Sequence, residues 1–430
     1  MTMLAGQSVR RVAIIGGNRI PFARSNTAYF GVSNQDMLTA AISGLVQRFN
    51  LKGEQLGEVA AGAVMKHSRD FNLVRECVLS SGLAPETPAY DLQQACGTGL
   101  EAAILVANKI ALGQIESGIA GGVDTTSDAP LGVNDEKRKV FMEINKAKTN
   151  GEKAKLALKL LNPKWFMPDV PKNAEPRTGL AMGDHAALTA KEWGITREAQ
   201  DELAWRSHKN LGKAYDEGWQ DDLISPFHGL NRDNNLRADS TLEKLATLKP
   251  VFGGEGGTMT AANSTPLTDG ASAVLLASEE WAAERNLPVL AYLTLGEVAA
   301  VDFVGKKEGL LMAPAYAVPS MLDKLGITLQ DFDFYEIHEA FASQVLATLK
   351  AWEDPAFCKE KLGRDAPLGS IDREKLNVKG SSLAAGHPFA ATGGRILANA
   401  AKLLNEKGSG RALISICAAG GQGVVAVLEK

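Results

Sequence analysis

Residues 95–100 read Ala-Cys-Gly-Thr-Gly-Leu and open an apolar helical stretch to Leu112, which is followed by Ile-Ala-Gly-Gly-Val at residues 119–123. A second stretch follows the same plan. It has Ala-Gly-His-Pro at residues 385–388, Thr-Gly-Gly at residues 392–394, a helical stretch to Leu404 and a strand-like run from Ile414 to the pair Gly420-Gly421. Each stretch is a turn, a glycine-rich helix start, an apolar helix, a strand and a glycine pair, which indicates a duplicated α/β unit. The alternative is that any two αβ units look alike at this level of detail.

The two halves of this duplication lie near residues 1–130 and 290–430. In the first half, apolar runs predict strands over residues 9–15, before Gly16-Gly17, and over residues 59–65. Helical spacing predicts a helix over residues 34–49 with Asn34 as its N-cap, and another over residues 70–83 that stops at Gly82 and Pro85. Such alternation is typical of a layered α/β core.

Composition excludes several classes of protein. The chain has 430 residues, 45% of them hydrophobic and 22% charged, with 43 glycines, so it is neither disordered nor of low complexity. Its length suggests roughly two to three domains. The net charge of −4 offers no general attraction for nucleic acid. We find no transmembrane run and no signal peptide, and four cysteines are too few for a disulfide scaffold. A reduced, cytoplasmic location is therefore expected.

The middle of the chain differs from the two halves. Residues 135–172 carry ten basic and five acidic side chains, although the whole chain is negative. Residues 155–161 (KLALKLL), with Trp165 and Phe166 nearby, are expected to form a basic amphipathic helix. Such a helix is usually a solvated face. The alternative is a surface that binds an anionic ligand, a protein partner or a membrane.

Cys96 and His387 are the first candidates for chemistry. Residues 90–92 are strand-like and residues 101–112 helical, so Cys96 is expected at a sharp strand-to-helix turn. A helix N-terminus favours the thiolate over the thiol, which predicts a nucleophile near neutral pH. His387 lies between Gly386 and Pro388, where the backbone positions it, and it is a candidate base for the Cys96 proton. The alternatives are a buried structural cysteine and an ordinary turn histidine.

Cys417 and His338 are the second pair of candidates. Cys417 ends an apolar strand before a glycine-rich loop, whose backbone N–H groups are suited to an oxyanion hole. His338 follows a strand-like run over residues 332–337 and is a candidate hydrogen-bond donor to an oxyanion. A cysteine that completes a buried strand and a capping histidine are the alternatives. Cys77 and Cys358 are interpreted as structural. No cysteine or histidine pair has the spacing of metal ligands, so no metal site is expected.

These motifs, taken in order along nearly the whole chain, resemble the thiolase family. The resemblance rests on Cys96 with its glycine-rich helix, on Ala-Gly-Gly-Val-Asp at residues 120–124, and on Met182-Gly183. It continues through residues 258–271 (TMTAANSTPLTDGA), His-Glu-Ala-Phe at residues 338–341, Gly-His-Pro at residues 386–388 and residues 417–423. Many thiolases carry Asn where His338 stands. At this position, and in Gly-Ser-Ser at residues 380–382, the sequence resembles the β subunit of the fatty-acid-oxidation trifunctional complex.

The resemblance implies a thiolase fold: two similar α/β domains in a five-layered α-β-α-β-α arrangement, plus a loop domain. It assigns residues 1–133 plus 260–283 to the N-terminal domain, residues 134–259 to the loop domain that covers coenzyme A, and residues 284–430 to the C-terminal domain. It also implies a homodimer or a dimer of dimers, with a hydratase/dehydrogenase α subunit as a further partner. No permanently bound cofactor is implied, because coenzyme A is a substrate.

The implied reaction is the cleavage of a 3-ketoacyl-CoA by coenzyme A into acetyl-CoA and a shortened acyl-CoA, within fatty-acid β-oxidation. The resemblance gives His387 the role of activating Cys96, which attacks the keto carbon. Backbone N–H groups of Cys96 and Ala419 would hold the oxyanion. His338 and His387 would stabilise the enolate oxygen of acetyl-CoA, and Cys417 would protonate the enolate carbon.

The resemblance also implies contacts with coenzyme A. Thr265 stands where the family has a coenzyme-binding serine, and Arg237 and Lys244 match positions that reach the nucleotide end. Met182 and Phe341 complete the set of binding residues. The chain departs from the family pattern at Ala181, where a histidine is common, and at Ala419, where glycine is common. Alanine keeps the backbone N–H group at this position and reduces the room for substrate.

Three other readings of the site are weighed. A biosynthetic acetoacetyl-CoA thiolase runs the same chemistry in reverse. Decarboxylating condensing enzymes share the fold but lack a second catalytic cysteine, so Cys417 favours a thiolase. A non-catalytic, lipid-binding homologue would be expected to lose the nucleophile or a histidine, whereas this chain keeps Cys96, His338, His387 and Cys417. The sequence determines neither the acyl chain length nor the physiological direction.

Overall fold

The computed structural model describes residues 9–165 and 167–430, and a ten-stranded mixed sheet runs through both halves of the chain. The N-terminal strands follow the order β1-β8-β5-β3-β4, and the C-terminal strands follow the order β9-β12-β11-β10. The N-terminal strands are β1 (Val12–Arg19), β2 (Ala23–Arg24), β3 (Glu58–Ala61), β4 (Ala89–Asp91), β5 (Ser117–Asp124) and β8 (Thr268–Ser278). The C-terminal strands are β9 (Ala291–Ala300), β10 (Phe334–Ile337), β11 (Arg411–Ala418) and β12 (Gln422–Glu429).

The strand pairing confirms the duplication. In the first half β1 pairs antiparallel with β8, β8 pairs antiparallel with β5, and β5 pairs parallel with β3. In the second half β9, β12, β11 and β10 repeat these three pairings in the same order. In the first half β3 also pairs parallel with β4. In the second half one parallel bridge, from Tyr335 to Leu376, stands at the same place. The halves meet where β1 pairs with β9 through Ala13 and Ile14.

Helices on both sides of the two sheet halves produce five layers. Helices α1 (Asn34–Arg48) and α2 (Leu73–Ser81) cover the outer face of the N-terminal half, and α10 (Pro314–Leu325) and α11 (Ala342–Glu353) cover that of the C-terminal half. Between the two halves lie α3 (Thr98–Ala111) and α14 (Thr392–Lys407). Strand residues alternate accordingly: Val424 and Ala426 of β12 face the central layer, whereas Val425 faces the outer one. The remaining helices here are α9 (Glu279–Glu284), α12 (Pro355–Leu362) and α13 (Ser382–Ala385).

The two central helices begin in direct contact. A Cβ built on Gly99 would lie 2.6 Å from the Ala390 carbonyl oxygen, and one built on Gly393 would lie 2.2 Å from the Leu100 nitrogen. Only glycine allows two backbones to approach this closely. The segments that precede α3 and α14 are therefore brought to the same place, although they lie about three hundred residues apart in sequence.

Several element boundaries differ from the sequence-based expectation. The first strand runs through Gly16 and Gly17 and does not end before them. A Cβ on Gly17 would lie 2.4 Å from Ala398 Cβ, so this glycine admits α14 against the strand. The strand expected over residues 59–65 ends at Ala61, because the N–H groups of Val64 and Met65 donate to the Asp124 carboxylate and not to a neighbouring strand.

The first two helices are confirmed with one correction. Ser33, and not Asn34, caps α1: the Asp36 N–H donates to Ser33 Oγ, and the Asp36 carboxylate accepts from the Ser33 N–H. Asn34 is buried, and its side-chain amide donates to the Met65 carbonyl instead. The second helix begins at Leu73 and ends at Gly82, whose φ of +92° belongs to the left-handed region, as predicted.

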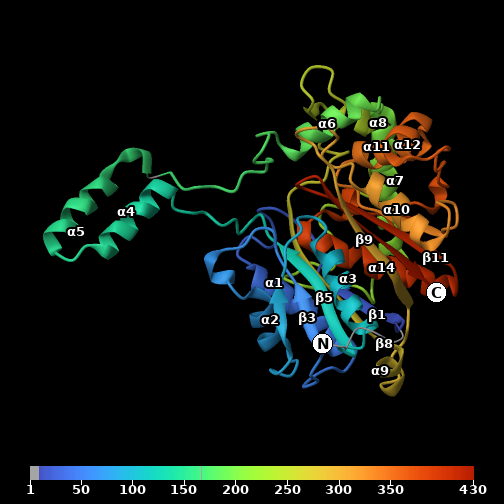
Figure 1. Cartoon of the computed structure of the whole chain (residues 1–430), viewed down its shortest axis with the longest axis horizontal. Helices are drawn as coiled ribbons and strands as arrows, with labels where there is room; N and C mark the ends of the chain where they lie inside the picture. Colours follow the sequence, from blue (N-terminus) through green and yellow to red (C-terminus); the bar gives the residue numbers. More distant parts are fainter. Residues whose placement is uncertain (1–8, 166) are drawn as a thin grey trace.

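The middle of the chain is an insertion between β5 and β8. It contains α4 (Asp135–Lys146), α5 (Asn150–Ala157), α6 (Met182–Glu192), α7 (Arg197–Asp216), α8 (Leu242–Ala246) and the strand pair β6 (Pro250–Phe252) and β7 (Met259–Thr260). Short 3₁₀ helices lie at Ser68–Asp70, Leu158–Leu161, Pro163–Trp165, Arg373–Lys375 and Phe389–Ala391. Helices α6, α7 and α8 lie against the C-terminal half (Figure 1).

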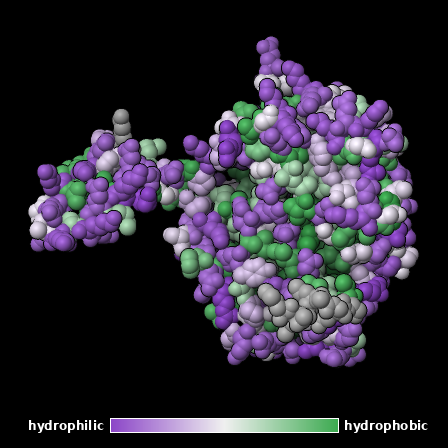
Figure 2. All heavy atoms as spheres, viewed as in Figure 1, coloured by the Kyte–Doolittle hydropathy of each residue, from purple (hydrophilic) through white to green (hydrophobic). Residues whose placement is uncertain are grey.

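Helices α4 and α5 form a hairpin that extends away from the main body (Figure 1). Gly132 and Asp169 join the two connecting segments at its base by a pair of backbone hydrogen bonds of 2.8 Å. The single helix expected over residues 155–161 is wrong, because α5 ends at Ala157 and a 3₁₀ turn follows. Leu158 and Leu161 are 66% and 68% exposed, and Figure 2 shows hydrophobic and hydrophilic residues mixed on the hairpin. Phe166 lies outside the described residues.

Among the described residues, no helix combines the length and the apolar character needed to cross a membrane.

We predict that Gly99→Ala lowers the free energy of unfolding by roughly 1–3 kcal/mol, the usual cost of overpacking a close-packed interior. The added methyl group would meet backbone atoms, which cannot move aside as a flexible side chain can. Urea denaturation followed by circular dichroism measures the effect. Gly151→Ala is the matched control, since a Cβ at this position of α5 has no neighbour within 4 Å. Equal stability of the two variants would contradict the prediction.

Candidate active site

Cys96 lies at the turn between β4 and α3, as predicted. Ala95 adopts a φ of +46°, which is uncommon for a residue with a side chain and bends the chain sharply before the cysteine. Two hydrogen bonds hold this turn: Thr98 Oγ1 donates to the Ala95 carbonyl (2.7 Å) and accepts from the Gln94 N–H (2.9 Å). The thiol is therefore presented from a rigid corner at the start of a buried helix.

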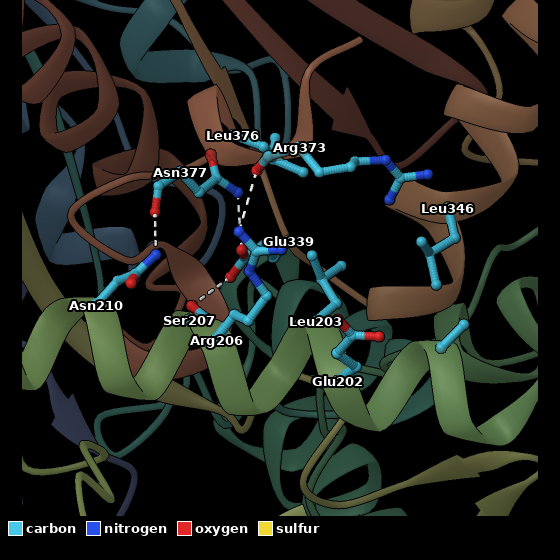
Figure 3. A pocket seen from close by; sticks show the side chains of 11 residues that line it. Glu202, Leu203, Arg206, Ser207, Asn210, Glu339, Leu346, Arg373, Leu376 and Asn377 are labelled. Carbon is cyan, nitrogen blue, oxygen red and sulfur yellow. Dashed lines mark hydrogen bonds between the residues drawn. The ribbon is translucent and has the colours of Figure 1, made fainter. Parts of the chain in front are cut away.

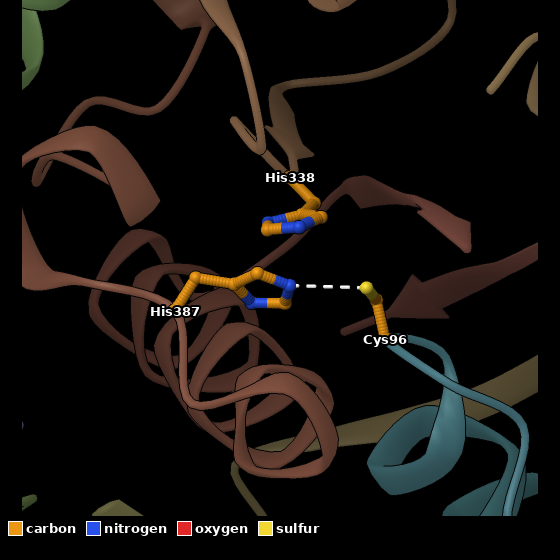
Figure 4. A group of neighbouring side chains, drawn as sticks. All are labelled: Cys96, His338 and His387. Carbon is orange, nitrogen blue, oxygen red and sulfur yellow. Dashed lines mark hydrogen bonds between the residues drawn. The ribbon is translucent and has the colours of Figure 1, made fainter. Parts of the chain in front are cut away.

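His387 comes from the equivalent corner of the second half. The preceding residue, Gly386, has a φ of +99°, and a Cβ there would lie 2.8 Å from Thr268 Cγ2, so the position requires glycine. The His387 N–H donates to Thr268 Oγ1 (2.8 Å), and its Nδ1 lies 2.5 Å from Thr392 Oγ1. Its Nε2 lies 3.0 Å from the Sγ of Cys96 (Figure 4). The predicted thiol–imidazole pair is therefore formed.

His338 lies directly after β10 and packs on His387, with ring centroids 4.1 Å apart (Figure 4). Its backbone N–H donates to the Ser415 carbonyl of β11 (2.8 Å), and its Nδ1 lies 2.7 Å from Ser382 Oγ. Its other ring nitrogen, Nε2, is buried and has no hydrogen-bond partner among the described residues. A polar atom in this state is available to a bound molecule.

Cys417 lies near the end of β11 and is only 4% exposed. Burial raises the pKa of its thiol, and the nearby Cys96 raises it further, so the two sulfur atoms share one electrostatic environment. The turn that follows is held by Glu175, whose Oε1 accepts from the Gly420 N–H (2.6 Å). The neighbouring Ala419 N–H forms a hydrogen bond that favours the Cys96 thiolate. Both cysteines and both histidines thus meet in one place.

The protonation state of Cys96 differs from the sequence-based expectation. A helix N-terminus was expected to stabilise the thiolate, yet burial raises the pKa of Cys96 to about 12 despite the Ala419 hydrogen bond. Burial, followed by the Arg395 charge, lowers the pKa of His387 to about 3. The resting pair is therefore a neutral thiol beside a neutral imidazole, because desolvation disfavours both ions.

Three side chains of this site also have ligand atoms within 4.8 Å of one another: Cys96, His338 and His387. The sequence analysis expected no metal site because no close pair occurs along the chain, and the fold brings these residues together from three distant segments. Thiol and imidazole are ligands that zinc prefers. The absence of a metal site stays a prediction.

Met182, Phe341 and Thr265 are gathered near Cys417. Phe341 and Cys417 are buried in one apolar cluster, and Met182 and Phe252 pack against it. Thr265 donates to the Ala340 carbonyl through both its N–H and its Oγ1, at 3.0 Å each. The sequence analysis missed Phe252, whose ring meets that of Phe341 edge-on at 6.1 Å.

Arg237 and Lys244 stand apart from this group. Both are exposed; Arg237 donates to the Asn234 and Leu236 carbonyls, and Lys244 Nζ lies 4.0 Å from Asp239. Among the described residues, none of their hydrogen bonds or ion pairs reaches the two cysteines. Cys77 and Cys358 are buried away from the site, with thiols donating to backbone carbonyls, which agrees with their structural interpretation.

Glu339 supports the site from behind, and the sequence analysis gave this neighbour of His338 no role of its own. Its buried carboxylate accepts hydrogen bonds from Ser207 Oγ (2.7 Å), Asn377 Nδ2 (2.7 Å) and the Leu383 N–H (3.1 Å). It thereby ties the segment that carries His338 to α7 and to the loop before His387. Figure 3 shows Glu339 at a pocket of about 330 Å³ beside α7. Its proximity to His338 in sequence was the one available signal.

We predict that Cys96 carries no thiolate at neutral pH. Ultraviolet thiolate absorbance measured for the whole chain and for Cys96→Ser should be the same near neutrality and diverge only as the pH approaches the raised pKa of about 12. Cys77→Ser, which removes another buried thiol, is the matched control. A difference of one thiolate at neutral pH would show that the helix N-terminus outweighs burial.

The comparisons with known proteins agree with this geometry. The family models for the thiolase N-terminal and C-terminal domains match residues 12–280 and 288–430. A 3-ketoacyl-CoA thiolase of Pectobacterium carotovorum is 43% identical over 97% of this chain and 96% of its own length. One of Yersinia pestis is 42% identical over 97% of both chains.

Two solved structures are similar over nearly their whole length. A Bacillus anthracis acetyl-CoA acetyltransferase has a TM-score of 0.81 and 29% identity, covering 98% of this chain and 99% of its own. A human mitochondrial 3-ketoacyl-CoA thiolase has a TM-score of 0.80 and 27% identity, covering 99% of this chain and all of its own. The family models, these relatives and the five-layered fold together establish that the chain belongs to the thiolase family and has the thiolase fold.

Proposed function

We propose that the protein is an acetyl-CoA C-acyltransferase that cleaves 3-ketoacyl-CoA with coenzyme A. The observation that carries the proposal is the 3.0 Å contact between Cys96 Sγ and His387 Nε2, in a buried site that also holds a second thiol, Cys417. Relatives at 42–43% identity are named 3-ketoacyl-CoA thiolases. A similar human structure is described as a complex with CoA.

Breaking a carbon–carbon bond requires a place for the electron pair of the leaving carbon. In a 3-ketoacyl thioester that carbon lies next to the thioester carbonyl, so the pair moves onto the thioester oxygen as an enolate. The site must therefore supply a nucleophile for the keto carbon, donors for two oxyanions and a proton for the enolate carbon.

Cys96 and His387 supply the nucleophilic step. Because both groups are neutral at rest, His387 Nε2 takes the thiol proton as Cys96 attacks the keto carbon. Thr392, 2.5 Å from Nδ1, holds the ring in place while its charge changes. The acyl group then stays on Cys96 as a thioester until coenzyme A removes it.

Backbone and imidazole donors serve the oxyanions. The Ala419 N–H already forms a hydrogen bond with Cys96, and with the Cys96 N–H it is placed for the oxygen of the attacked carbonyl. The free Nε2 of His338, together with His387, is placed for the enolate oxygen. Each such donor contributes about 3–4 kcal/mol in other enzymes. Cys417, a neutral thiol, protonates the enolate carbon.

Coenzyme A is proposed to enter along the apolar cluster of Met182, Phe252 and Phe341, with Thr265 at its edge. Arg237 and Lys244, both exposed cations, are proposed to meet its phosphates. We further propose the domain division of the sequence analysis: residues 1–133 with 260–283, a loop domain over residues 134–259, and residues 284–430. Coenzyme A bound in this way would be a substrate, and we propose no permanently bound cofactor.

The same site also runs in reverse, joining two acetyl-CoA molecules to form acetoacetyl-CoA. The similarity to the Bacillus anthracis acetyl-CoA acetyltransferase supports this second candidate. The discriminating measurement is kcat/KM for thiolysis over a series of 3-ketoacyl-CoA chain lengths. A preference for chains longer than acetoacetyl-CoA supports a degradative role in β-oxidation, and activity on acetoacetyl-CoA alone supports the biosynthetic one.

Cys96→Ala is expected to abolish both thiolysis and the formation of an acyl-enzyme, because no other described thiol contacts His387. Cys417→Ala is expected to leave acylation of Cys96 by a simple acyl-CoA intact and to lower carbon–carbon cleavage by roughly 10²–10⁴-fold, the usual contribution of a general acid. Mass spectrometry of the acyl-enzyme and a thiolysis assay measure the two steps. Normal turnover by Cys96→Ala would refute the function; equal loss of both steps in Cys417→Ala would refute its role.

We also propose a homodimer, a cytoplasmic location and a hydratase/dehydrogenase subunit as partner. Strand β4 is the last strand at the N-terminal end of the sheet, so its outer edge is open to pairing with a second copy. The exposed hairpin of α4 and α5 offers a separate surface that combines lysines with Leu158 and Leu161.

Reversing the charge of Lys153, Lys155 and Lys159 is expected to abolish co-purification with the partner, or binding to anionic vesicles, without changing thiolysis of soluble substrates. Electrostatic attraction near an anionic surface is worth about 1 kcal/mol per lysine, so three reversals remove most of it. The control reverses three exposed lysines of the main body: Lys52, Lys213 and Lys359. Unchanged binding by the hairpin variant would exclude this surface.

A further inference from the structure

The hydroxyl of Ser382 lies between the catalytic-site histidine His338 and a buried arginine. Ser382 Oγ is 2.7 Å from His338 Nδ1 and 2.8 Å from Arg395 Nη2. Ser382 has no exposed surface, Arg395 is 2% exposed and His338 is 1% exposed. These are the only hydrogen-bond partners of Ser382 Oγ among the described residues.

The direction of each hydrogen bond follows from the inventory of donors. Arginine only donates, so Ser382 Oγ accepts from Arg395. The hydroxyl proton of Ser382 then has one acceptor in reach, the Nδ1 of His338. A neutral imidazole whose Nδ1 accepts carries its proton on Nε2. We propose that Arg395, acting through Ser382, is a positioning residue that locks His338 in the neutral Nε2–H tautomer.

The charges around His338 agree with a neutral ring. Burial, the neighbouring His387 and Arg395 all lower the pKa of His338 well below its usual value. Burial, followed by the Arg19 charge, lowers the pKa of Arg395 to about 10. Three acidic groups, Glu336, Asp233 and Glu339, act in the opposite direction, so Arg395 stays charged near neutral pH. Both oxygens of Glu336 are buried without a hydrogen-bond partner among the described residues, and burial raises the pKa of this group to about 8, so it is mostly protonated near neutral pH.

The lock separates the roles of two adjacent imidazoles. His387 Nε2 faces the Cys96 thiol and must accept a proton. His338 Nε2 is unpartnered among the described residues, and with its proton fixed there it is a permanent donor available to a bound molecule. This part of the inference rests on the proposed function: the donor serves the enolate oxygen, where the other tautomer would present a lone pair and repel it.

The tautomer is measured directly, without any variant. Nitrogen NMR of the full chain with isotope-labelled histidine distinguishes Nε2–H from Nδ1–H rings, and the signal of His338 is identified by its loss in His338→Gln. We expect a single neutral Nε2–H form that does not titrate near neutral pH. A protonated ring, an Nδ1–H ring or a mixture in the unaltered protein overturns the inference.

A matched pair of serine variants tests the consequence. Ser381 also accepts from Arg395 Nη2, at 3.3 Å, but does not contact His338. We expect Ser382→Ala to lower kcat for thiolysis by roughly 10- to 100-fold with little change in KM. The reason is that a misplaced His338 donor no longer stabilises the charge that develops in the transition state. Ser381→Ala should change kcat little. Ser382→Thr keeps a hydroxyl at this position, so it should retain most of the kcat that Ser382→Ala loses.

Two further comparisons exclude a merely structural effect. In a His338→Gln background, Ser382→Ala should cause no additional loss in kcat, since the serine acts only through the histidine. Acylation of Cys96 by a simple acyl-CoA should remain normal in Ser382→Ala. A full additional loss, or equal loss of acylation, overturns the proposed coupling. If the NMR result holds while the unaltered protein shows no thiolysis, the proposed function fails and the tautomer lock stands.

Discussion

The close approach of α3 and α14 is the constraint on which the active site depends. Two helices that begin with Gly99 and Gly393 in contact are enclosed between the two halves of the sheet, and each is preceded by a corner that carries one reacting group. Cys96 and His387 meet because their helices meet. The proposed catalytic pair is therefore a consequence of backbone packing, which glycine at positions 99 and 393 allows.

The duplication places an equivalent corner before α3 and before α14, and the two corners carry different side chains. The first presents a thiol after a strained residue at position 95, and the second presents an imidazole after a glycine with a positive φ. Desolvation favours the neutral form of both groups, so in the proposed mechanism proton transfer accompanies attack and does not precede it. A third segment, directly after β10, adds His338, whose proposed tautomer is set by Ser382 and Arg395.

Local pattern indicated a layered α/β core and a duplicated unit, but it left structural alternatives open for each cysteine and histidine. The resemblance to the thiolase family added the five-layered fold and the roles proposed for the two cysteines and the two histidines. Glycine pairs and apolar runs mark the turns of an αβ unit wherever they occur, and Gly82 ended its helix as expected. Boundaries failed where tertiary contacts decide them: Gly16 and Gly17 continue a strand because Phe49 and Ala398 pack there. The thiolate expectation failed for the same reason, since a helix N-terminus is local and burial is not. Ser382, Arg395 and Glu175 lie far apart in sequence from the groups they orient, so no spacing identifies them.

Strands β11 and β12 are the final strands in chain order, yet β11 carries Cys417 and β12 packs against the Cys96 turn, where a Cβ on Gly97 would meet Val424 at 2.5 Å. The nucleophile at residue 96 therefore leaves the ribosome long before the residues that enclose it. The imidazole of His387 comes from the same half of the chain, so Cys96 has no base beside it before this half docks. The proposed reactive pair is therefore completed only after the C-terminal half has folded against the N-terminal half.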